Sequence, residues 1–288
     1  METSELLRRV RRIEIKTKAL TNNIFAGEYH SAFKGRGMSF AEVREYQPGD
    51  DVRDIDWNVT ARMNRPYIKI FEEERELTLM LLIDLSASQR FGTHERTQRD
   101  LVTEIAATLS FSAMQNNDKI GAVFFTDRIE KFIPPQKGRK HILYIIRELI
   151  NFEPQGKRTD LSVVLKYLVK VMSKRSIAFM LSDFLTNNNY TKELNVAARK
   201  HEVIALQVYD KCMAQLPNVG LMKIVDIETG HEHYIDTSSV AVRNHQQRWW
   251  ALQQSQLIST FQKSKVDYTS VATDDDYVRP LINLFAQR

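Results

Sequence analysis

Residues 77–88 read LTLMLLIDLSAS. The first seven residues are almost all apolar, which is typical of a strand that is buried on both faces in the middle of a parallel sheet. The apolar run stops at Asp84, and two serines follow at alternate positions, Ser86 and Ser88. This stretch therefore predicts a central strand that delivers three oxygen-bearing side chains to the carboxyl edge of a sheet.

The sequence that follows alternates short apolar runs with helical periodicities. Further strands are expected at 119–125, 177–181, 202–208 and 266–272, and helices at about 96–115, 138–151, 160–173, 191–200, 239–263 and after residue 276. Two hairpins are also expected: in the first, TDR turns the strand 119–125 back into the edge strand IEKFIPP, and the second lies in LMKIVDIETGHEHYID. Such an alternation predicts an α/β fold with one doubly wound, mostly parallel sheet, Rossmann-like in its layering.

Residues 1–75 have a different pattern. They contain one amphipathic helix followed by sequence rich in glycine and charge, in which Pro48-Gly49-Asp50 is a turn signal. We therefore predict a small N-terminal lobe over 1–75 and a main domain over 76–288.

Composition excludes several classes of protein. The chain has 288 residues, of which 43% are apolar and 27% charged, as expected of a globular protein with a substantial core. No apolar run approaches the roughly 18 residues of a membrane span, and the first residues lack the apolar stretch of a secretory signal, so a cytoplasmic location is expected. Cys212 is the only cysteine, which excludes an intramolecular disulfide.

The net charge of +5 and the pI of about 9.1 make a nucleic-acid-binding protein one alternative. The densest basic cluster consists of Arg8, Arg9, Arg11 and Arg12. Apolar residues recur around it at helical spacing, which favours interpreting the arginines as the solvated side of an amphipathic helix.

The residues that carry chemistry fall at strand ends. In a doubly wound sheet, ligands bind beyond the carboxyl ends of the strands, where the strand order reverses. Asp183 follows the strand 177–181 as Asp84 follows the first strand, and Thr159 lies in the turn before the helix that leads there. Carboxylate and hydroxyl oxygens are hard ligands that suit Mg²⁺. The predicted metal site comprises Asp84, Ser86, Ser88, Thr159 and Asp183, with Mg²⁺ as the expected ion and Mn²⁺ or Ca²⁺ as alternatives.

The pattern D-x-S-x-S, then a threonine, then an aspartate after a later strand resembles the metal-ion-dependent adhesion site of von Willebrand factor A (VWA) domains. Two features depart from that pattern: Arg158 stands where glycine is usual, and Gln89 and Arg90 follow the second serine. Arginine here could weaken metal binding or help to bind an acidic group of a partner. The alternative interpretation is that these polar residues only cap helices and close turns.

The N-terminal lobe narrows the resemblance. Residues 35–76, GRGMSFAEVREYQPGDDVRDIDWNVTARMNRPYIKIFEEERE, followed by the D-x-S-x-S strand, are similar to bacterial proteins of domain-of-unknown-function family 58. This resemblance covers most of the chain. It implies a cytoplasmic partner of MoxR-type AAA+ ATPases that acts as an adaptor in chaperone-like complex assembly or metal insertion.

The expected mechanism is a protein contact bridged by metal. One coordination position of Mg²⁺ would stay open, and an Asp or Glu of the partner would complete it. No phosphate-cradling loop is present and no histidine falls within the metal turn, so a non-enzymatic role is predicted. The enzyme alternative is a Mg²⁺-dependent phosphohydrolase similar to the haloacid dehalogenases. That class has D-x-D at this turn, where this chain has Ser86 in place of the second aspartate.

Overall fold

The computed structural model describes residues 10–14, 38–73, 77–93, 96–186, 188–225 and 231–287. The chain divides into two compact units, one of residues 33–77 and one of residues 1–32 with 78–288. The described segment 10–14 is helical and belongs to the larger unit, although it falls within the predicted lobe. Arg11 and Arg12 are exposed there, as expected for the solvated side of a helix, and Arg8 and Arg9 lie outside the described residues. The boundary at residue 75 stays a prediction.

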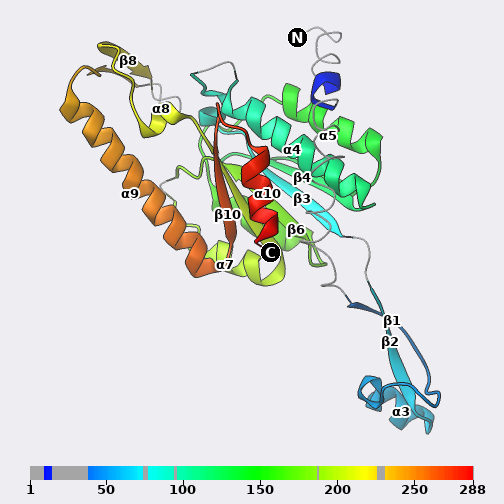
Figure 1. The fold of residues 1–288 in the computed structure, drawn as a ribbon. Coiled ribbons are helices and arrows are strands. Elements are labelled where there is room, and N and C mark those ends of the chain that lie inside the picture. The colour runs from blue at the N-terminus through cyan, green and yellow to red at the C-terminus, as the bar shows by residue number, and fades with distance from the viewer. Residues whose placement is uncertain are drawn as a thin grey trace. The chain divides into compact units, whose positions relative to one another are not determined.

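The larger unit is built on a six-stranded sheet with the order β10-β7-β6-β3-β4-β5 (Figure 1). The strands are β3 (Thr78–Asp84), β4 (Lys119–Phe125), β5 (Ile129–Gln136), β6 (Ile177–Ser182), β7 (Glu202–Tyr209) and β10 (Asp267–Ala272). Neighbouring strands are parallel except β5, which pairs antiparallel with β4. The prediction of a doubly wound, mostly parallel sheet is confirmed.

Helices cover both faces of this sheet (Figure 1). They are α4 (Gln98–Gln115), α5 (Arg139–Asn151), α6 (Leu161–Val171), α7 (Thr191–Lys200), α8 (Lys211–Ala214), α9 (Val240–Ser264) and α10 (Val278–Ala286). On one face, apolar side chains of α6, α7 and α9 pack with Met80, Leu82 and Met180. On the other face, Phe285 of α10 meets Phe179 edge to face. No helix among the described residues is both long and apolar enough to cross a membrane.

The strand order places β3 at the centre of the unit. The chain leaves β3 toward β4 on one side and later returns to β6 on the other, so the order reverses between β3 and β6. Six of the seven residues of β3 are buried, which explains the uninterrupted apolar run in its sequence. The carboxyl ends of these two strands therefore form the crevice where doubly wound sheets bind ligands.

A hairpin stands between β7 and α9. It consists of β8 (Leu221–Val225) and β9 (Glu232–Asp236), which pair antiparallel with each other alone. A hairpin was predicted here. Its predicted turn, at Thr229 and Gly230, lies outside the described residues.

The smaller unit pairs β1 (Met38–Glu45) antiparallel with β2 (Tyr67–Glu73) and adds the short helices η2 (Val52–Asp54) and α3 (Trp57–Met63). Its acidic side chains hold turns and helix ends. Asp50 accepts two hydrogen bonds from the Arg44 guanidinium, at 2.7 and 2.8 Å, and Asp56 caps α3. Arg44 holds the pKa of Asp50 below its usual value.

Candidate metal centre

Asp84 is the last residue of β3 and is completely buried. Its Oδ1 accepts a hydrogen bond from the backbone N–H of Ser86 at 2.8 Å. Its Oδ2 accepts from the Ser182 hydroxyl at 2.6 Å and from the Thr159 hydroxyl at 3.3 Å. The carboxylate is thus the meeting point of three segments that lie far apart in the sequence.

The two serines stand on a short turn after Asp84. Ser86 precedes the short helix η3 (Ala87–Arg90) with its side chain buried, whereas Ser88 is partly exposed. Their hydroxyl oxygens are 3.1 Å apart and share a hydrogen bond. Two hydroxyls and one carboxylate therefore converge within five residues, as the D-x-S-x-S spacing predicted.

Thr159 is brought to Asp84 by the loop between α5 and α6. The backbone N–H of Ala87 donates to the carbonyl of Lys157 at 3.0 Å, which ties this loop to the serine turn. The N–H of Asp160 donates to the carbonyl of Thr126 at 3.1 Å, and the Thr186 hydroxyl donates to the carbonyl of Thr159 at 3.0 Å. The threonine is therefore held from three sides.

Glu130 on β5 anchors the same loop. Its carboxylate accepts from the N–H groups of Gly156 at 2.7 Å and Gln155 at 3.1 Å and from the Thr126 hydroxyl at 2.8 Å. Burial raises the pKa of the Glu130 carboxyl, but these hydrogen bonds outweigh burial and lower the pKa overall. A Cβ atom on Gly156 would overlap the Thr126 hydroxyl and the Asp127 carboxylate, so only glycine fits against this turn.

Asp183 follows β6 and is completely buried. Its Oδ1 accepts from the N–H of Leu185 at 3.0 Å. Phe184 comes next with a φ of 59°, a left-handed conformation that costs a bulky residue free energy. Phe184 is held there by an edge-to-face contact with Phe261 of α9 and by a hydrogen bond from its N–H to Ser182 Oγ at 3.0 Å.

Of the predicted residues, the hydrogen bonds join Asp84 to Ser86 and Thr159, and Ser86 to Ser88. On β6, Ser182 rather than Asp183 donates to Asp84. The sequence analysis missed Ser182. Side chains of a strand alternate between the two faces of the sheet, and this alternation was the available signal. Leu82 of β3 is paired with Met180 of β6, so two residues further along, Asp84 and Ser182 lie on the same face as these two.

The electrostatics of Asp84 favour a bound cation. Burial raises the pKa of its carboxyl, and hydrogen bonds from Ser182, Ser86 and Thr159 offset this only in part. A carboxylate in this position is costly unless a positive charge lies beside it. The surrounding donor set of hydroxyl and carboxylate oxygens has the hard character that Mg²⁺ prefers. The residues present therefore fit the predicted ion.

Two further observations bear on metal binding. Among the described residues, no group of three or more His, Cys, Asp or Glu side chains is placed to hold a metal ion. The predicted set differs in composition, because three of its five members are hydroxyl residues. Beside Ser88, Gln89 is buried, and neither atom of its amide has a hydrogen-bond partner in the described part of the chain. Such a buried amide is a place where ordered water binds.

A second buried carboxylate, Asp210, lies at the end of β7 on the same sheet edge. It accepts hydrogen bonds from the N–H groups of Thr93 and Cys212, both at 2.9 Å, and from the hydroxyls of Thr93 and Thr273. Burial raises the pKa of Asp210, but this set of hydrogen bonds lowers it overall. Asp210 therefore joins three loops of the fold as a fully hydrogen-bonded anion.

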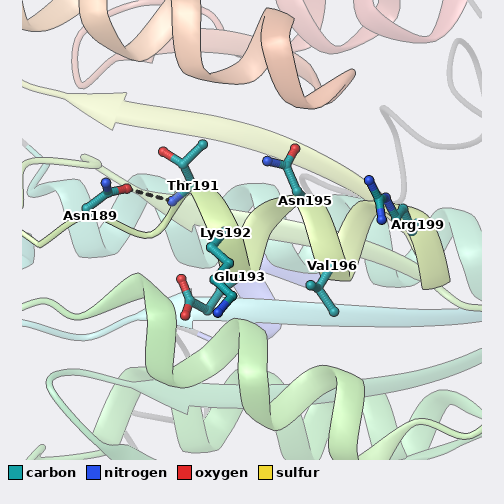
Figure 2. A pocket seen from close by; sticks show the side chains of 7 residues that line it. All are labelled: Asn189, Thr191, Lys192, Glu193, Asn195, Val196 and Arg199. Carbon is teal, nitrogen blue, oxygen red and sulfur yellow. Dashed lines mark hydrogen bonds between the residues drawn. The ribbon is translucent and has the colours of Figure 1, made fainter.

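A surface hollow of about 620 Å³ lies along α7. Figure 2 shows that its lining side chains all come from α7 and the turn before it: Asn189, Thr191, Lys192, Glu193, Asn195, Val196 and Arg199. Asn189 Oδ1 accepts a hydrogen bond from the N–H of Thr191, the first residue of α7, at 3.0 Å. Since one helix supplies the whole lining, the side chains diverge, and the hollow lacks the converging groups of a catalytic pocket.

Comparison with known proteins identifies the family. The family model described as "Protein of unknown function DUF58" matches residues 42–256. The chain belongs to the DUF58 family. The uncharacterized protein Rv1480 of Mycobacterium tuberculosis is 31% identical over 292 residues, covering 100% of this chain and 91% of that protein. The uncharacterized protein YeaD of Bacillus subtilis is 30% identical over 109 residues, covering 38% of this chain and 25% of that protein.

Solved structures resemble this DUF58 chain in fold alone. An aerotolerance-related membrane protein from Bacteroides fragilis matches with a TM-score of 0.51 and 12% identity, covering 73% of this chain and 97% of that one. The conserved hypothetical protein BatB from Bacteroides thetaiotaomicron matches with a TM-score of 0.50 and 12% identity over 73% and 98%. At such identities the match describes backbone architecture and assigns no activity.

Proposed function

We propose that this DUF58 protein is a non-enzymatic, Mg²⁺-dependent interaction module that works in the cytoplasm as an adaptor for a MoxR-type AAA+ ATPase. The observation that carries the proposal is the buried Asp84 carboxylate, which meets the Thr159 hydroxyl beside the paired hydroxyls of Ser86 and Ser88. These groups lie at the crevice where the strand order reverses, the usual ligand position of a doubly wound sheet.

In this proposal, Asp84, Ser86, Ser88, Thr159 and Asp183 hold the ion, directly or through water. The bound ion supplies a positive charge that attracts a carboxylate of a partner protein. Ser88 is the more exposed of the two serines, so a partner side chain would approach the ion from the side of Ser88. The Ser86 backbone N–H and the buried Thr159 hydroxyl both donate to Asp84, and the Ser86 hydroxyl pairs with Ser88, so in this proposal the site is formed before the partner binds.

The MoxR-type partner and the role in complex assembly or metal insertion rest on the family resemblance. The proposal of a non-enzymatic role rests on the surroundings of Asp84, because the side chains that donate hydrogen bonds to its carboxylate are the hydroxyls of Thr159 and Ser182. A hydroxyl group at its ordinary pKa is a poor general base, so water activation by a side chain is not favoured here.

The test is a pull-down with a MoxR-type AAA+ ATPase from the same organism. Capture should require Mg²⁺, stop on addition of EDTA and be lost in Asp84→Ala. The double variant Lys192→Ala/Arg199→Ala, on the exposed side of α7 (Figure 2), should bind as the wild type does. Capture that is indifferent to both EDTA and Asp84→Ala would overturn the metal bridge. Hydrolysis of p-nitrophenyl phosphate that depends on Asp84 would instead support the phosphohydrolase alternative.

A further inference from the structure

Two exposed cations directly precede Thr159. Lys157 and Arg158 both point their side chains to solvent, whereas Gly156 before them and Thr159 after them are buried. The carbonyl of Lys157 accepts the N–H of Ala87, the residue between the two serines of the metal turn. The backbone that carries these cations is therefore in contact with the candidate metal site itself.

The other charged side chains around this loop have partners within the chain. Arg90 pairs with Glu153, and Arg128 pairs with Asp127 at 3.2 Å. Asp160 caps α6 by accepting from the N–H of Ser162 at 2.8 Å.

The Glu130 carboxylate is likewise occupied, by two backbone N–H groups and one hydroxyl. Within the described part of the chain, no ion pair joins Lys157 or Arg158 to a carboxylate. They are the cations of this rim that are available to a ligand.

The backbone of this loop is held by several hydrogen bonds. Its backbone is fixed by hydrogen bonds from Gln155 and Gly156 to Glu130, from Ala87 to Lys157 and from Asp160 to Thr126. A ligand that pairs with these cations therefore orders only their side chains, which keeps the entropic cost of binding low.

The positions of the charges set the expected ligand. Asp84 and Asp183 together carry two negative charges when ionised, which a divalent ion neutralises. Lys157 and Arg158 then stand exposed beside the site with no ion pair among the described residues, while the Glu130 and Asp160 carboxylates are taken up by hydrogen bonds within the loop. One partner carboxylate on the ion leaves these two cations unpaired, whereas a second carboxylate nearby can pair with them.

We propose that Lys157 and Arg158 select an acidic peptide segment, in which one carboxylate completes the metal site and a second carboxylate, one to three residues away, pairs with these cations. This inference rests on the proposed metal-bridging function and names the partner's chemistry at that site. Pairing with exposed cations contributes modestly in affinity and more strongly in selectivity and in the rate of association.

The experiment uses two fluorescein-labelled dodecapeptides of glycine and serine, one with a single central Glu and one with a central Glu followed two residues later by Asp. Their binding to the full-length protein is measured by fluorescence anisotropy in Mg²⁺. The wild type should bind the di-acidic peptide about two- to fivefold more tightly. Lys157→Ala/Arg158→Ala should remove this preference, while the variant still binds Mg²⁺ and still binds the mono-acidic peptide.

Lys192→Ala/Arg199→Ala, which makes the same change of charge on α7, should keep the preference for the di-acidic peptide. A preference that persists in Lys157→Ala/Arg158→Ala, or a wild type that binds Mg²⁺ but does not distinguish the peptides, would overturn this inference and leave the proposed function standing. A wild type that fails to bind Mg²⁺ in calorimetry would overturn the proposed function and, with it, this inference.

Discussion

Replacing Asp84 by asparagine should change stability in opposite directions with and without metal. Asparagine keeps the size of the side chain and an oxygen that can accept the N–H of Ser86. It removes a buried negative charge whose pKa is raised by burial. A carboxyl whose pKa is raised in the folded state lowers stability at any pH above its unfolded pKa, so at neutral pH the metal-free variant should be at least as stable as the wild type.

The magnitudes follow from linkage. Each pKa unit by which the fold disfavours the carboxylate corresponds to about 1.4 kcal/mol of stability that asparagine restores. In the wild type, Mg²⁺ at ten times its Kd adds about 1.4 kcal/mol. For a chain of this size that is a rise in Tm of roughly 3–6 °C. The variant, which lacks the charged ligand, should show no rise.

Differential scanning calorimetry at pH 7.5, with 5 mM EDTA or with Mg²⁺, measures both effects. Asp210→Asn is the matched control, because it removes a buried carboxylate from the same sheet edge whose pKa is lowered by hydrogen bonds. That control should lose about 1–3 kcal/mol and keep the response to Mg²⁺. An Asp84→Asn variant that keeps the Mg²⁺ response, or that is less stable than the wild type without metal, would refute the reasoning.

Three further predictions concern a buried histidine, the loop that carries Thr159 and the packing of α9 on the sheet. Burial lowers the pKa of His201 to about 4, so the wild type should lose up to about 3 kcal/mol of stability as the pH falls from about 6.5 toward 4. Urea unfolding at both pH values should show a smaller loss for His201→Leu. Gly156→Ala should cost about 1–3 kcal/mol and weaken Mg²⁺ binding in calorimetry, because the added Cβ displaces the loop that carries Thr159, whereas Gly138→Ala, where the Cβ meets no atom, should leave Mg²⁺ binding unchanged. Phe261→Ala should cost about 3–5 kcal/mol in urea unfolding, since Phe261 is fully buried against Phe184; a loss below 1 kcal/mol would contradict the packing of α9 on the sheet.

The sheet was predictable because burial leaves a direct trace in the sequence. β3, β4, β6 and β7 are covered on both faces, so each is mostly apolar, and the observed bounds agree with the predicted ones within two residues. The position of Asp84 at the end of such a run was visible for the same reason. The long helix α9 was also visible, at Val240–Ser264 against a prediction of 239–263.

Contacts between distant loops were not predictable in the same way. Ser182 reaches Asp84 only because β6 lies beside β3, and the strand order is a property of the whole sheet. Asp210 was missed because its partners, Thr93 and Thr273, come from loops far away in the chain. The glycine at 156 was visible as a residue, but its reason, the close approach of Thr126, required the folded hairpin.

The most direct test of the account is the position of the ion. Crystals of the full-length protein grown with Mn²⁺ should show one strong anomalous peak beside the Ser86 and Ser88 hydroxyls, at about 2.0–2.3 Å from their oxygens, and crystals of Asp84→Ala should lack it. A peak elsewhere on the chain, or none at this turn in the wild type at saturating Mn²⁺, would contradict the assignment of this site as a metal centre.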